Sequence, residues 1–82
     1  MQQDYQRDAI QIVELEYQHL PYKLKMALIY AFENEYTAKV FCLVGPAMRP
    51  SWVRQLLLDR REIIIGSGVD LEQFNAAIDS FE

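Results

Sequence analysis

Three breaks divide this chain into short segments and limit the length of every regular element that it can form. They fall at Leu20-Pro21, Gly45-Pro46 and Gly66-Ser67-Gly68. Proline removes a backbone donor and glycine costs a helix conformational entropy, so regular structure ends at such positions. Eighty-two residues leave little room for a second core. We therefore expect one domain over residues 1–82.

Between the breaks, apolar residues recur at three- and four-residue steps, which predicts helices. Thr37 is the expected N-cap of the third helix and Asp70 that of the last. The run Ile63-Ile64-Ile65 leaves a short strand open, although no second strand with an alternating pattern is available to pair with it. The predicted fold is an all-α bundle of four to five short helices, which span about residues 4–18, 21–33, 38–44, 50–64 and 69–82.

The composition indicates a folded chain in a reducing compartment. Hydrophobic residues make up 51% of it, more than a disordered segment would hold. A single cysteine, Cys42, excludes an internal disulfide framework. The amino terminus lacks the pattern of a signal peptide, and no apolar run approaches the length of a membrane span. We expect a cytoplasmic protein that does not associate with membranes.

The charges are unevenly distributed. The net charge is −4, yet residues 19–62 hold seven of the eight lysines and arginines. Both ends of the chain are acidic. A basic middle between acidic ends gives a hint about partners and carries no information about the fold.

The residues available for chemistry are few. His19 is the single histidine, and Cys42 lies in the apolar run 40–44. Together they cannot supply the four ligands of a structural zinc site. Gly66-Ser67-Gly68 lacks the lysine and the preceding strand of a phosphate-binding loop. We expect no enzymatic activity, no metal and no cofactor.

Residues 20–64 have the order of elements of a helix-turn-helix unit. A short helix ends at Gly45, and a longer helix that carries arginines follows. In such units the second helix enters the major groove of DNA, and flanking cations contact phosphates. The candidate DNA-binding residues are Lys39, Arg49, Ser51, Trp52, Arg54 and Gln55.

The same stretch resembles a known family. Leu20 to Ile29, LPYKLKMALI, is similar to the "LP-x-K-x-x-x-A-L" opening of sigma-factor region 4 and of phage late-gene regulators of the antiterminator type. Ala38-Lys39 with Leu43, followed by the run 51–56, is similar to the two helices of their helix-turn-helix. The resemblance covers residues 20–62. It implies a small phage or bacterial transcription regulator that binds DNA, RNA polymerase or both.

A second hypothesis from the sequence is a protein-interaction module or inhibitor without nucleic acid. A small acidic helical protein can place one amphipathic helix face in a groove of a partner protein, or pair that face with a second copy of itself. Two apolar faces, one near each end of the chain, are candidates for this contact or for a homodimer. They consist of Tyr5, Ile12 and Tyr17, and of Phe74, Ile78 and Phe81.

Overall fold

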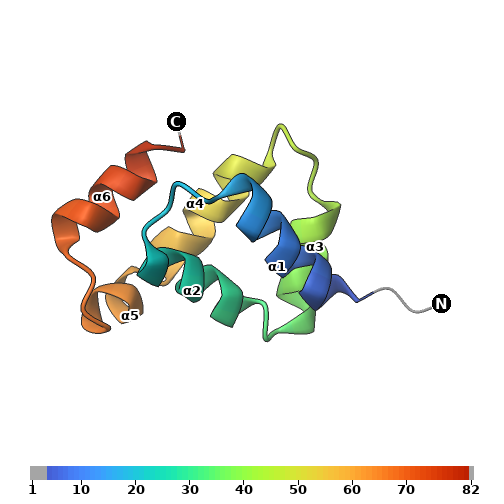
Figure 1. Ribbon diagram of the computed structural model, residues 1–82, viewed down its shortest axis with the longest axis horizontal. Coiled ribbons are helices and arrows are strands. Elements are labelled where there is room, and N and C mark those ends of the chain that lie inside the picture. Colours follow the sequence, from blue (N-terminus) through green and yellow to red (C-terminus); the bar gives the residue numbers. More distant parts are fainter. Residues whose placement is uncertain (1–3, 82) are drawn as a thin grey trace.

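The computed structural model describes residues 4–81, and this part of the chain forms six α-helices and no strand (Figure 1). The expected all-α bundle is confirmed. Within the described residues, no helix has the length and apolar character needed to cross a bilayer. The helices are α1 (Tyr5–Glu16), α2 (Tyr22–Ala31), α3 (Glu35–Leu43), α4 (Arg49–Asp59), α5 (Arg61–Gly66) and α6 (Leu71–Asp79).

The number of helices exceeds the expected four to five because the predicted fourth helix is divided. Arg60 leaves the helical region, with φ −106° and ψ 13°. Its amide donates to the carbonyl of Leu57 at 3.1 Å, three residues back, which closes α4 with a tight turn. The chain then restarts as α5, which includes Ile63-Ile64-Ile65, so this run is helical and not a strand. Arginine is a good helix former, and nothing in the local sequence marks this break.

Side-chain caps explain where three helices begin. Asp4 accepts a hydrogen bond from the amide of Arg7 at 3.0 Å, and Asp70 accepts one from the amide of Glu72 at 2.7 Å. Asp70 is therefore the cap that the sequence predicts. The prediction of Thr37 as a cap is wrong, because Asn34 accepts from the amides of residues 36 and 37 and starts α3 three residues earlier.

Helix α4 lies at the centre of the fold. It packs against α2, α3 and α6, while α1 covers α2 and α3 (Figure 1). Val53 and Leu57 on its inner face are fully buried. Because α4 has neighbours on several sides, only part of its surface faces solvent. The other large side chains that are fully buried are Val13, Leu24, Leu28, Phe32, Phe41 and Phe74.

Candidate functional site

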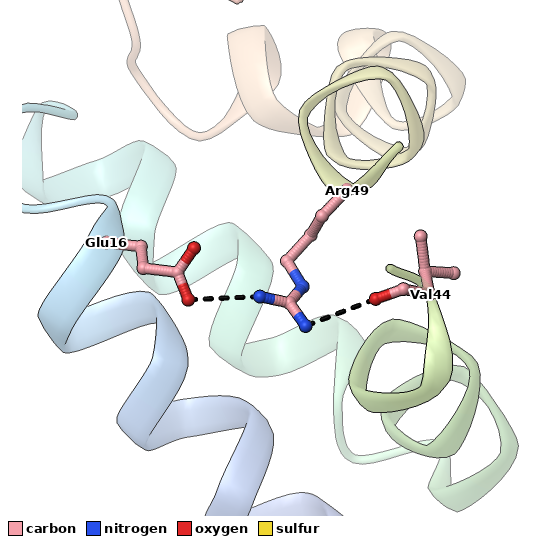
Figure 2. A network of polar contacts seen from close by, with 3 residues as sticks. All are labelled: Glu16, Val44 and Arg49. Atoms are coloured by element: carbon pink, nitrogen blue, oxygen red, sulfur yellow. Dashed lines mark hydrogen bonds and ion pairs between the residues drawn. The ribbon is translucent and has the colours of Figure 1, made fainter. Parts of the chain in front are cut away.

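Arg49, the first residue of α4, points into the protein (Figure 2). It is only 8% exposed. Its Nη1 donates to Oε2 of Glu16 at 3.0 Å, and its Nη2 donates to the carbonyl of Val44 at 3.1 Å. The guanidinium carbon lies 5.4 Å from the centre of the Phe41 ring, on whose face a cation is attracted.

The position of Arg49 follows from the ends of two helices. Glu16 is the last residue of α1, and Val44 is the C-cap of α3. Carbonyls at a helix C-terminus lack intrahelical donors and carry partial negative charge. Arg49 pairs with the side-chain carboxylate of Glu16 at the end of α1 and donates to the carbonyl of Val44 at the end of α3. Arg49 was predicted to contact a phosphate, and the structure instead assigns it to the junction of α1, α3 and α4.

Three other polar candidates for DNA binding, Lys39, Ser51 and Gln55, are at the surface. Lys39 and Ser51 are exposed, and Lys39 Nζ lies 5.9 Å from the centre of the Tyr5 ring. Gln55 is exposed as well, and its Nε2 donates to Oδ1 of Asp59 at 2.9 Å. The exposed DNA-binding candidates on α4 are thus the uncharged side chains of Ser51 and Gln55.

Trp52 and Arg54 are half-buried on α4. The Trp52 ring packs against Phe41, with 5.6 Å between ring centres. Beside Trp52, a shallow hollow is lined by Val44, Gly45, Met48, Ser51 and Trp52. The surface where a recognition helix would first meet base edges is therefore mainly apolar.

The two faces predicted to bind a partner form the core instead. Tyr17, Phe74 and Ile78 are buried. Tyr5, Ile12 and Phe81 are half-buried and pack against the core. The amphipathic patterns of the first and last helices were recognised correctly, but they hold the domain together and are not free docking surfaces.

A different apolar surface, which was not predicted from the sequence, lies between α2 and α5. Tyr22, Tyr30 and Ile63 are 72%, 62% and 73% exposed. They surround a groove of about 290 Å³, which we call the α2–α5 groove. Its lining consists of Tyr22, Lys23, Met26, Ala27, Tyr30, Ile63, Ile64 and Ser67.

This groove exists because α2 carries two apolar stripes. Leu24 and Leu28 face the core and are fully buried. Tyr22, Met26 and Tyr30 follow at four-residue steps on another face and line the groove. The four-residue spacing was visible in the sequence, and a search for a second stripe on this helix would have found it.

The other wall of the groove depends on the break at Arg60. On α5, Ile64 is buried against the core, while Ile63 faces solvent. If α4 had continued without a break, the directions of the Ile63 and Ile64 side chains would have followed from the direction of α4. No sequence signal for this wall exists.

Lys23 is the only charged side chain among the described residues that line the groove. Its Nζ donates to the carbonyl of Ser67 at 3.4 Å, so it spans from α2 to the end of α5. Gly68 leaves room for it: φ there is +104°, and a Cβ atom at this position would lie 2.9 Å from Nζ. The groove therefore carries a positive charge at the amino-terminal end of α2.

Two structural features bear on the nucleophilic and metal-binding candidates. Burial raises the pKa of the Cys42 thiol, as does the negative charge of Asp8, while Arg49 opposes the shift. A raised pKa lowers the fraction of reactive thiolate. Among residues 4–81, no cluster of three or more potential metal ligands is present.

No known protein family, curated protein or solved structure matches this chain.

Proposed function

We propose that this chain is a non-enzymatic protein-interaction domain and that the α2–α5 groove is its docking surface. The observation that carries the proposal is the clustering of Tyr22, Tyr30 and Ile63, each more than half exposed, around one groove. Single exposed apolar residues are normal, whereas a contiguous patch of large ones marks an interaction site. Tyrosine and methionine are also enriched where proteins bind one another.

The shape of the groove favours a helical partner segment. Two neighbouring helices, α2 and α5, form its walls. A third helix can place apolar side chains between such walls in the way that amphipathic helices fill the grooves of other domains. The rings of Tyr22 and Tyr30 offer apolar faces, and their hydroxyl groups can keep hydrogen bonds to water at the rim.

A transcription-related role that involves DNA is the second candidate. It is supported by the order of α3, the connection 44–48 and α4, and by the exposed side chains of Lys39, Ser51 and Gln55. It ranks second because Arg49 is held in the interior and α4 packs against three other helices. Binding to RNA polymerase is compatible with the first proposal, since the polymerase is itself a protein.

The test of the docking surface is site-specific photo-crosslinking in the cells that make this protein. A photoreactive phenylalanine analogue replaces Tyr30 in one variant and Tyr36 in another. Tyr36 is the matched control, because it is a tyrosine on α3 with 73% exposure, comparable to that of Tyr30. A third variant carries the analogue at Ser51 on α4. Mass spectrometry then identifies each product.

The proposal predicts a discrete protein adduct from position 30 and much less from positions 36 and 51. Nucleic-acid adducts from position 51, together with none of any kind from position 30, would overturn it in favour of the second candidate. A salt series on purified chain and duplex DNA separates the two independently. Contacts to phosphates weaken steeply as salt is added, whereas an apolar docking contact changes little.

A further inference from the structure

We infer that the occupant of the α2–α5 groove is a second copy of this chain, bound so that the two α2 helices run antiparallel about a two-fold axis. This inference rests on the proposed docking surface and names its partner.

The apolar stripe on α2 is complementary to itself. Tyr22 and Tyr30 lie four residues to either side of Met26, and all three line the groove. A two-fold axis beside Met26 places each Met26 against its equivalent, and each Tyr22 against Tyr30 of the second copy. A two-fold interface uses one patch twice, so a stripe with this symmetry satisfies its central requirement.

The charges at the two ends of the stripe fix the antiparallel direction. Lys23 lies at the start of α2, and Glu33 follows Tyr30 by three residues at the other end. Both side chains are exposed. In the antiparallel arrangement, Lys23 of each copy lies within about one helical turn of Glu33 of the other, which gives two opposite-charge pairs. A parallel arrangement would bring like charges together.

The Lys23 ammonium group and the backbone turn that carries Glu33 each have a contact on the same domain. Lys23 donates to the carbonyl of Ser67. The turn that carries Glu33 is fixed by Gln6, whose Nε2 donates to the carbonyls of Phe32 and Glu33 at 3.1 and 3.0 Å. Exposed ion pairs add little affinity, but they select the orientation and register of an interface.

A chain of this size also gains from such a contact. A domain of this length buries roughly 60% of the surface that its unfolded form exposes, so its own core stabilises it only marginally. Covering Tyr22, Tyr30 and Ile63 in a dimer removes apolar surface from water that the monomer leaves exposed.

The test is sedimentation equilibrium of the full chain and its variants over a roughly hundredfold range of concentration. Wild-type protein is expected to shift from monomer to dimer with increasing concentration. Tyr30→Lys should weaken association at least about tenfold, because it places a charge in the apolar contact. The matched variant Tyr36→Lys should leave association unchanged. Circular dichroism on each variant confirms that it is folded.

Charge reversal tests the register. Lys23→Glu and Glu33→Lys should each weaken association severalfold, because each creates two like-charge pairs in its own dimer. An equal mixture of the two variants should associate as wild type does, because every pair in the mixed dimer is again of opposite sign. The double variant Lys23→Glu with Glu33→Lys should do the same.

Two results would overturn the inference in different ways. A chain that stays monomeric throughout, and whose position 30 crosslinks a different protein, refutes the dimer and leaves the proposed docking surface standing. A dimer that is insensitive to Tyr30→Lys and to both charge reversals uses another face and refutes the inference, whereas the proposed docking surface fails only when position 30 also yields no protein adduct.

Discussion

Arg49 Nη1 lies 3.0 Å from Glu16 Oε2, and this contact joins the first residue of α4 to the last residue of α1 across 33 positions of the chain (Figure 2). The pair is asymmetric, because the arginine side chain is 9% exposed and the glutamate side chain is 49% exposed. Arg49 is thus a buried cation with one partly hydrated partner and one backbone partner.

This asymmetry predicts unequal effects of mutation. Arg49→Ala removes the packing on Phe41 and both hydrogen bonds, and we expect it to lower the free energy of unfolding by about 2 kcal/mol. Glu16→Gln keeps an acceptor in place, and solvent already screens the half-exposed charge, so we expect a loss below about 1 kcal/mol. Urea unfolding followed by circular dichroism measures both.

Arg61→Ala is the control for Arg49→Ala, because Arg61 is an exposed arginine at the start of α5. It should change stability by no more than about 0.5 kcal/mol. An Arg49→Ala protein as stable as the Arg61→Ala protein would show that the interior role of Arg49 is mistaken.

Two substitutions on α2 should show that its buried stripe contributes more to the stability of the fold than its exposed stripe does. Leu28 is fully buried, and Leu28→Ala should cost about 3 kcal/mol by leaving a cavity. Tyr30→Ala should cost less than about 1 kcal/mol, because Tyr30 is mostly exposed. Equal losses of stability from the two variants would mean that Tyr30 belongs to the core. The groove would then not be a docking surface.

The burial of Tyr17 predicts that the folded protein loses stability at alkaline pH. Burial raises its pKa above the ordinary value of about 10, and the charge of Glu16 adds to the shift while Arg49 opposes it. The folded protein therefore holds this proton more tightly than the unfolded chain does. The resulting stabilisation is fully present at a pH below the pKa of Tyr17 in the unfolded chain. It is lost as the pH rises through the pKa of Tyr17 in the folded protein.

Thermal unfolding between about pH 9 and pH 11 tests this prediction. Wild-type protein should lose more stability over this interval than Tyr17→Phe, which has no phenol to ionise. Tyr36→Phe, which changes an exposed tyrosine, should follow wild type. Parallel curves for wild type and Tyr17→Phe would contradict the assigned burial of this hydroxyl.

Cys42 should react slowly in the folded protein. Its pKa is raised, first by burial, and its Sγ lies 3.5 Å from the carbonyl of Tyr5. We expect iodoacetamide at neutral pH to alkylate it about tenfold more slowly than it alkylates the urea-unfolded chain. Equal rates in the two states would contradict the packing of α3 against α1.

The sequence predicted those features of the fold that depend on residues close to one another in the chain. The breaks at Leu20-Pro21 and Gly45-Pro46 separate helices in the structure, and Asp70 caps α6. Leu24 and Leu28, which lie one helical turn apart, are buried on the inner side of α2. Each of these depends on residues within one or two turns of each other.

Features set by contacts between distant segments could not be predicted in this way. From the sequence alone, an arginine that follows Gly45-Pro46 is expected to be a surface cation. Only the structure shows that its partner Glu16 lies beside it. The apolar face of α6 was recognised, but the pattern does not say whether such a face meets its own core or another protein. The sequence around Arg60 likewise does not mark the division of α4 from α5, beyond which Ile63 is exposed.

The most direct test of the central claim is a nuclear magnetic resonance comparison of the two surfaces on one isotope-labelled sample. Spectra are recorded as the concentration of the chain rises, and then as duplex DNA is added at about physiological salt. We predict that signals of Tyr22, Met26, Tyr30 and Ile63 shift with chain concentration and that those of Lys39, Ser51 and Gln55 stay fixed when DNA is added. Shifts at Lys39, Ser51 and Gln55 on addition of DNA, with the groove unchanged throughout, would contradict the account.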